Sequence, residues 1–327
     1  MNARPKFRKR EKNLSQENTK GKVHPYEGGQ ASPVSRKKKR LRYIAVLPSF
    51  ITLMNGACGF MAIVFASRSP TLGLTLPFIR RSYLTSFSIA GYFIFLAMIA
   101  DVLDGRVARL TRTTSSFGGQ LDSLSDAVSF GVAPAFLMIK LSEFHLENLK
   151  DLSQRFSMLL GRVIFFSAIL YAMCAIVRLA RFNVENEEDE AAHMNFAGLP
   201  SPAAAGVVVS LVVLHQQLFQ RFAEGPSGVF YNFEIFSVLA LPTITLFTGI
   251  LMVTRIRYPH LANHLLRGKK TLASLLAFFA AGLFIVWNIQ LAMVIGFCGF
   301  AIAGVIRWLI GSAAKKASRR SDNLPGV

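Results

Sequence analysis

Long apolar stretches alternate with short polar connections along most of the chain. Each stretch approaches the roughly 20 residues that an α-helix needs to cross the hydrocarbon core of a bilayer. We expect eight such segments, at 44–66, 84–103, 123–140, 158–180, 200–219, 234–254, 271–288 and 290–311. Almost no loop separates the last two, and we interpret them as a tight helical hairpin. The pattern predicts an all-α integral membrane protein, a bundle of about eight transmembrane helices.

The composition agrees with this class. The chain has 327 residues, of which 52% are hydrophobic and 17% charged, whereas soluble domains average about 25% charged residues. Apolar residues are too plentiful for the bulk of the chain to be disordered. The three cysteines, at 58, 174 and 298, all lie inside apolar stretches, which indicates small buried side chains and excludes a disulfide scaffold.

Positive charge is concentrated at the ends of the chain. Residues 1–43 hold 14 Lys and Arg against three Glu and show no apolar periodicity, so we expect a disordered basic cytoplasmic tail. The transmembrane domain would then span 44–311, with a second basic tail at 312–327. The RKKKR run at 36–40 directly precedes the first span, where it would fix the topology and contact anionic lipid headgroups. Because no aromatic residues are interleaved with it, we expect no nucleic acid partner.

The distribution of basic residues predicts the orientation. With eight spans and a cytoplasmic N-terminus, 29 of the 37 Lys and Arg fall on the cytoplasmic side and eight fall outside. Cytoplasmic loops of membrane proteins carry such an excess of basic residues. We therefore expect a multi-pass protein with both termini in the cytoplasm.

One stretch, residues 101–126, concentrates acidic side chains at the end of a span. Asp101 and Asp104 are three residues apart and Asp122 and Asp126 are four apart, so each pair shares one face of a helix. The connection at 105–121 contains three glycines that allow a turn between two helices. Folding these helices together would bring four carboxylates to the cytoplasmic end of the bundle, and charged groups there indicate function.

Four neighbouring carboxylates repel each other unless something compensates their charge. A divalent cation would do so, and a site built from oxygen ligands suits Mg²⁺, Mn²⁺ or Ca²⁺. Such a cation is usually completed by substrate phosphates, and two cations could clamp a diphosphate during phosphoryl transfer. The alternative is a set of salt bridges to Arg106, Arg109 and Arg112.

The stretch also carries an extended motif, Asp101-x2-Asp104-Gly105-x2-Ala108-Arg109-x8-Gly118-x3-Asp122-x3-Asp126. This motif resembles the signature of the CDP-alcohol phosphatidyltransferase family at every fixed position. The sequences SLSDAVSFGVAPA, RLARFN at 178–183 and FAGLPSP at 196–202 resemble the branch of the family that uses serine. The resemblance covers roughly residues 41–205.

The resemblance implies a chemistry and a role for each matching residue. A phosphatidyl group would pass from CDP-diacylglycerol to the hydroxyl of L-serine, giving phosphatidylserine and CMP, with Mg²⁺ or Mn²⁺ as cofactor. Asp126 would be the general base and could also touch a metal ion. The other implied roles are metal binding for Asp101, Asp104 and Asp122, and CDP-diacylglycerol binding for Gly105, Ala108, Arg109, Gly118, Thr52 and Asn55.

Further expectations concern the acceptor and the setting. Arg178 and Arg181 are candidates for binding the serine carboxylate, because a guanidinium fork suits that group; their alternative role is to fix topology. The family resemblance implies a homodimer in a bacterial cytoplasmic (inner) membrane, with the site on the cytoplasmic side. Two rival functions stay open: the same transfer to glycerol 3-phosphate or inositol phosphate, and an ion-coupled transporter. Transporters place coupling ions near the bilayer midplane rather than at a span end.

Overall fold

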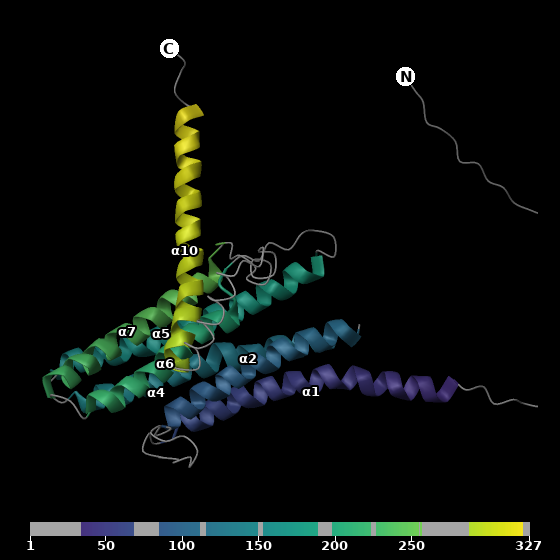
Figure 1. The fold of residues 1–327 in the computed structure, drawn as a ribbon, viewed down its shortest axis with the longest axis horizontal. Coiled ribbons are helices and arrows are strands. Elements are labelled where there is room, and N and C mark those ends of the chain that lie inside the picture. Colours follow the sequence, from purple (N-terminus) through teal and green to yellow (C-terminus); the bar gives the residue numbers. More distant parts are fainter. Residues whose placement is uncertain are drawn as a thin grey trace, which may run out of the picture. The chain divides into compact units, whose positions relative to one another are not determined.

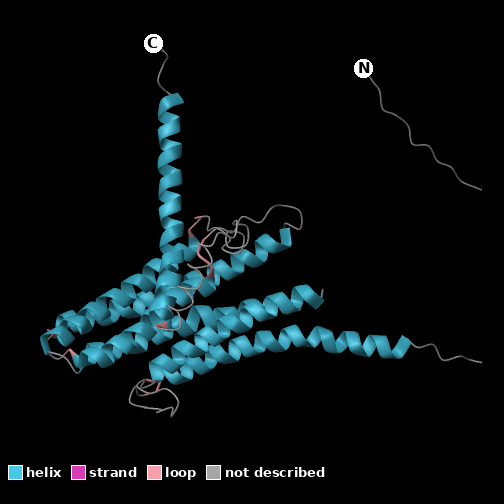
Figure 2. Ribbon diagram, viewed as in Figure 1, coloured by secondary structure: helices cyan, strands magenta, loops and turns pink. Residues whose placement is uncertain are grey.

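The computed structural model describes residues 34–68, 85–111, 116–149, 153–188, 198–223, 227–254, 256 and 288–322. Within these ranges every regular element is a helix (Figure 2). The helices labelled in Figure 1 and their neighbours are α1 (Val34–Ala66), α2 (Ser86–Thr111), α3 (Ser116–Asp126), the π-helix η1 (Ala127–Val132), α4 (Ala133–Asn148), α5 (Gln154–Glu188), α6 (Ser201–Ala223), α7 (Ser227–Val253) and α10 (Ile289–Asp322). Contacts divide the chain into Met1–Leu41 and Arg42–Val327, and the description below concerns the second unit.

Seven stretches of the described helices are long and apolar enough to cross a membrane: Ser49–Ala66, Ser86–Val107, Phe117–Asn148, Gln154–Val184, Ser201–Phe219, Tyr231–Val253 and Ile289–Ser312. Each overlaps one of the eight segments expected from the sequence. The remaining expected segment, 271–288, lies outside the described residues except for its last position. An all-α integral membrane protein is thereby confirmed.

Several helices run beyond the edges that hydropathy predicts. The first begins at Val34 rather than at residue 44, α2 continues to Thr111 instead of ending at 103, and α10 reaches Asp322 rather than 311. Hydropathy marks where a helix leaves the membrane and not where it ends. Lys, Arg and Ala are good helix formers, so these basic extensions stay helical. The connection expected at 105–121 is correspondingly short, since only 112–115 lie outside the described helices there.

The helices form one packed bundle around a shared core. Helix α5 packs against α4 and α7, and α6 packs against α2, α7 and α10. The largest buried side chains include Tyr171, Phe130, Leu137, Met138 and Val208. The three cysteines are free thiols, as expected from their apolar surroundings.

A π-helix lies directly after Asp126 and is the least regular part of the bundle. The carbonyl of Phe130 faces Pro134 four residues later, and proline has no N–H to donate to it. The hydroxyl of Tyr171 on α5 donates to this carbonyl instead, at 3.0 Å. Short π-helical segments often occur at functional sites. Here the segment connects α3, which carries Asp126, to α4, and the hydrogen bond from Tyr171 ties it to α5.

Small residues bring α1 against this π-helix. A side chain on Gly59 would place its Cβ 2.7 Å from the Cα of Ser129, and one on Gly56 would lie 3.2 Å from the hydroxyl of Ser125. Contacts between small residues let helix backbones approach closely in membrane proteins. The approach places the start of the first span beside the aspartates of α2 and α3.

A buried polar cluster joins α4, α6 and α7 in the other half of the bundle. His145 Nδ1 lies 3.3 Å from Glu234 Oε1, and Asn148 also hydrogen-bonds Glu234. The rings of His145 and His215 meet edge to face with centroids 4.6 Å apart. His145 and Glu234 are 1% and 4% exposed. The Nε2 atoms of His145 and His215 are buried without a hydrogen-bond partner in the described part of the chain, so the cluster is only partly satisfied.

We expect His145→Phe to lower the thermal unfolding temperature in detergent, because Glu234 then loses a buried partner. The cost of leaving such a group unpaired is about 1–3 kcal/mol. The double variant His145→Phe/Glu234→Leu should recover much of the loss, since both polar partners are gone. An unchanged unfolding temperature in the single variant would contradict this role of the pair.

Candidate functional site

The four aspartates of the motif lie where two helices end and begin. Asp101 and Asp104 lie in the C-terminal part of α2, and Asp122 and Asp126 lie in α3. Residues 112–115 separate the two helices in the sequence. The connection between them is short enough to hold both pairs at the same end of the bundle.

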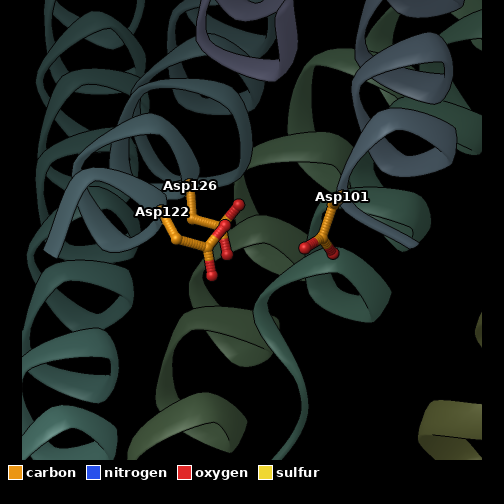
Figure 3. Close-up of side chains that lie close together, drawn as sticks. All are labelled: Asp101, Asp122 and Asp126. Carbon is orange, nitrogen blue, oxygen red and sulfur yellow. The ribbon is translucent and has the colours of Figure 1, made fainter. Parts of the chain in front are cut away.

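Three of the four carboxylates come together. One oxygen from each of Asp101, Asp122 and Asp126 lies within 4.8 Å of the others. Figure 3 shows the side chains of Asp122 and Asp126 side by side, with the carboxylate of Asp101 directed toward them from the other helix. The i, i+4 spacing on α3 therefore places Asp122 and Asp126 together, and three of the four carboxylates that we expect to meet lie close to one another.

The fourth aspartate, Asp104, is held by α1. The hydroxyl of Thr52 donates to Asp104 Oδ2, and both side chains are buried. Asp104 lies outside the group of three converging oxygens, although its charge still acts on Asp101, Asp122 and Asp126. Its predicted role as a metal ligand stays a prediction.

Two hydrogen bonds that involve Asn55 of α1 fix the position of Asp126. Asn55 Nδ2 donates to Asp126 Oδ1 at 2.8 Å, and the hydroxyl of Ser129 donates to the backbone carbonyl of Asn55 at 2.9 Å. Asn55 has no exposed surface and Asp126 is 8% exposed. Asp126 is therefore held in one orientation, with its second oxygen left for another partner.

The oxygen atoms at this site suit a hard divalent cation. Mg²⁺ and Mn²⁺ prefer carboxylate oxygens, and Mg²⁺ binds them at about 2.1 Å, so ligand oxygens around one ion lie within the spacing seen here. Asp122 Oδ1 is buried with no hydrogen-bond partner in the part of the chain that the structure describes. Among the described residues no ion pair to these aspartates is found either. The donor set thus fits a cation, which would compensate the negative charge that these carboxylates share.

One arginine approaches the cluster from α5. Arg178 lies close enough to Asp126 for their charges to attract each other. Its Nη1 donates to the hydroxyl of Ser201, the first residue of α6, at 2.6 Å. Arg181 lies one turn further along α5 and is half-buried. The structure therefore brings Arg178 to the site from a helix that supplies no carboxylate.

Gly105 and Gly118 of the motif lie on α2 and α3, the two helices that carry the aspartates. A Cβ on Gly105 would meet no atom of another part of the protein within 4 Å, so packing does not require glycine at this position. Gly118 is half-buried in the first turn of α3. The side chains of Ala108 and Arg109 lie outside the described residues.

Sequence reasoning missed the residues that hold the site together. Ser129 fixes Asn55, Gly59 admits Ser129, and Ser201 holds Arg178. The small residues of α1 and the serines at 125 and 129 are a sequence signal for close helix contact in a membrane. The contact between Ser201 and Arg178 has no such signal, because it depends on how two helices meet.

The fold and the site define a polytopic membrane protein with a carboxylate cluster suited to a divalent cation and a phosphorylated substrate. The sequence profile of the CDP-alcohol phosphatidyltransferase family matches residues 45–246. The chain belongs to this family.

Curated relatives agree with the family. The chain is 33% identical over 247 residues to a CDP-diacylglycerol–serine O-phosphatidyltransferase of Helicobacter pylori, covering 75% of this chain and 90% of that protein. It is 32% identical over 223 residues to a protein of the same name from Methanocaldococcus jannaschii, covering 68% and 78%. It is 29% identical over 224 residues to the archaetidylserine synthase of Methanothermobacter thermautotrophicus, covering 68% and 72%.

Removing one charge from the cluster should stabilise the protein when no cation is present. We expect Asp122→Asn to unfold at a higher temperature than the wild type in EDTA, because repulsion within the cluster is worth on the order of 1–3 kcal/mol. Mg²⁺ or Mn²⁺ should then stabilise the wild type more than the variant. Thermal unfolding in detergent measures both effects.

Glu143→Gln is the matched control, because it removes an exposed carboxylate of α4 that pairs with Lys140. It should change neither the unfolding temperature in EDTA nor the stabilisation by Mg²⁺ or Mn²⁺. A wild type whose unfolding temperature does not respond to either cation would contradict the assignment of the cluster.

Proposed function

We propose that this protein transfers the phosphatidyl group of CDP-diacylglycerol to the hydroxyl of L-serine, producing phosphatidylserine and CMP in phospholipid synthesis. The observation that carries the proposal is the convergence of Asp101, Asp122 and Asp126 within a family whose members use CDP-linked alcohols. Relatives named CDP-diacylglycerol–serine O-phosphatidyltransferase, one matched over 90% of its own length, support serine as the acceptor.

Asp101, Asp122 and Asp126, with Asp104 beside them, would hold Mg²⁺ or Mn²⁺. When bound, the cation supplies positive charge that neutralises the diphosphate of the substrate and the charge that develops during transfer. The chain's own contribution is to fix the positions of these oxygens through Thr52 and Asn55.

The CDP group would lie against the end of α2. Gly105 is exposed and has open space where a side chain would stand, which suits a close approach of the nucleotide to the backbone. Ala108, Arg109 and Gly118 follow along the same motif and would complete the nucleotide site. Thr52 and Asn55 contribute by holding the two aspartates that face it.

Asp126 would act as the general base. It would accept the proton of the serine hydroxyl while the serine oxygen bonds to the phosphorus attached to diacylglycerol, and the bond from that phosphorus to CMP breaks. Asn55 keeps the carboxylate oriented for this transfer. Most of the rate enhancement would come from positioning and charge neutralisation, as in other phosphoryl transfers.

Arg178 is the candidate that the geometry favours for the serine carboxylate. It reaches toward Asp126, the proposed base, so a serine bound by its carboxylate to Arg178 could present its hydroxyl there. A guanidinium offers a fork of donors to a carboxylate, and the hydrogen bond to Ser201 uses only one of them. Arg181 would assist from the next turn of α5.

The setting that we propose is the cytoplasmic (inner) membrane of a bacterium. The excess of basic residues in the predicted cytoplasmic segments supports cytoplasmic termini and a cytoplasmic site, where CDP-linked precursors and serine meet. We further propose a homodimer, on the ground of the family to which the chain belongs.

The test is CMP release by the purified protein in detergent. CDP-diacylglycerol and Mn²⁺ or Mg²⁺ are supplied with serine, glycerol 3-phosphate, inositol or inositol phosphate in separate reactions. The proposal predicts metal-dependent release with serine alone. CMP release only with another acceptor would overturn serine as the acceptor. No CMP release by folded protein would favour the rival function of an ion-coupled transporter.

Asp126→Asn should abolish CMP release while CDP-diacylglycerol still binds, because the amide keeps the size of the side chain but cannot accept the serine proton. Turnover in the presence of serine and binding of the lipid are measured separately. Near-normal turnover in this variant would show that another group is the base.

Gly105→Leu should raise the KM for CDP-diacylglycerol about tenfold or more, because a steric cost of 1.4 kcal/mol already corresponds to tenfold. The unfolding temperature should stay near that of the wild type, since no protein atom lies within 4 Å of the added Cβ. Gly161→Leu on α5, where a side chain also meets no protein atom, is the control. An unchanged KM for CDP-diacylglycerol in Gly105→Leu would contradict the placement of the nucleotide against α2.

A further inference from the structure

The segment that enters α6 is tied to the end of α7. Gly198 donates its N–H to the carbonyl of Ile256 at 2.8 Å, and Leu199 donates to the carbonyl of Leu251 at 3.0 Å. Leu251 carries one of the last carbonyls of α7, which have no donor within the helix, and Ile256 follows the end of α7. We call the two bonds the α7 clasp.

Only glycine fits the first position of the α7 clasp. Gly198 has a φ of 93°, which side-chain-bearing residues rarely adopt. A Cβ there would overlap the carbonyl oxygen of Met252 and lie 3.0 Å from that of Thr254. The conformation and the crowding are independent reasons for glycine at this position.

Three residues after Gly198, the chain presents Ser201 to the site. Ser201 has no exposed surface, and its hydroxyl accepts a hydrogen bond from Arg178 Nη1 at 2.6 Å. Leu199 is fully buried between the two contacts, so the segment has little freedom to move. The position of the hydroxyl is therefore set by the α7 clasp on one side and by α6 on the other.

Arg178 depends on this hydroxyl for its orientation. Its Nε is buried without a hydrogen-bond partner in the described part of the chain, and no carboxylate forms an ion pair with it there. Asp126 attracts the guanidinium but forms no hydrogen bond with it among the described residues. Ser201 is thus the described partner that fixes the guanidinium.

We infer that Ser201 and Gly198 are positioning residues for the acceptor: the α7 clasp holds Ser201, and Ser201 aims the Arg178 guanidinium at the carboxylate of the amino-acid acceptor. The inference rests on the proposed function and deepens it. It also gives α7, which supplies no side chain to the site, a defined part in selecting the acceptor.

The test is steady-state kinetics of Ser201→Ala with both substrates varied. Loss of a hydrogen bond to a charged group typically reduces binding by tenfold or more. We expect the KM for serine to rise about tenfold, while kcat and the KM for CDP-diacylglycerol change by less than about twofold. A merely structural role would raise both KM values or lower kcat.

A double variant separates action through Arg178 from other effects. In an Arg178→Lys background, adding Ser201→Ala should change the serine KM by less than about twofold, because lysine does not depend on the same fork geometry. An equal effect of Ser201→Ala in both backgrounds would overturn the inference. So would an unchanged serine KM in the single variant.

Gly198→Ala tests the α7 clasp itself. It should raise the serine KM in the same direction as Ser201→Ala, whereas Gly299→Ala on α10, where a side chain meets no protein atom, should not. If Gly198→Ala does not fold, the Ser201 variants still decide the inference. A wild type that releases no CMP with serine would instead overturn the proposed function, which keeps the two failures distinct.

Discussion

Mutual repulsion of carboxylates in an apolar bundle is the constraint on which this structure depends. Asp101, Asp122 and Asp126 bring oxygens within 4.8 Å of one another, and Asp104 adds a fourth charge nearby. Ionised groups beside a membrane interior are expensive unless they are paired. The helices of this end supply hydrogen bonds to two of the aspartates but no described ion pair. A cation with a phosphate-bearing substrate resolves that repulsion, and this links the fold to the chemistry.

A local departure from α-helical geometry, the π-helix after Asp126, helps to hold these charges in place. Pro134 leaves the Phe130 carbonyl without its usual donor, and Tyr171 supplies a hydroxyl in its place. The resulting π-helix presents Ser129 to α1, where Gly59 leaves room for it. Asp126 stands at the junction of these contacts. A loosely held carboxylate would be a poor general base, so the contacts of the π-helix serve to fix the orientation of Asp126.

The sequence predicts much of this arrangement because helix periodicity is local. The four-residue spacing was enough to bring Asp122 and Asp126 together on α3, and seven of the eight apolar segments overlap a described span. The contacts of Asn55 with Asp126, and of Arg178 with Ser201, join residues far apart in the chain. They depend on how helices meet, which periodicity does not encode. The His145–Glu234 pair was missed as well, although ionisable residues inside apolar segments are themselves a signal.

The central claim is that the three converging aspartates bind a divalent cation, and the most direct measurement is electron paramagnetic resonance of Mn²⁺ titrated into the detergent-solubilised protein. The account predicts saturable binding that falls at least about tenfold when Asp101, Asp122 and Asp126 are all replaced by asparagine, since most of the ligand charge is then lost. Glu143→Gln should bind as the wild type does. Folded wild-type protein that binds no more Mn²⁺ than the triple variant would contradict the account.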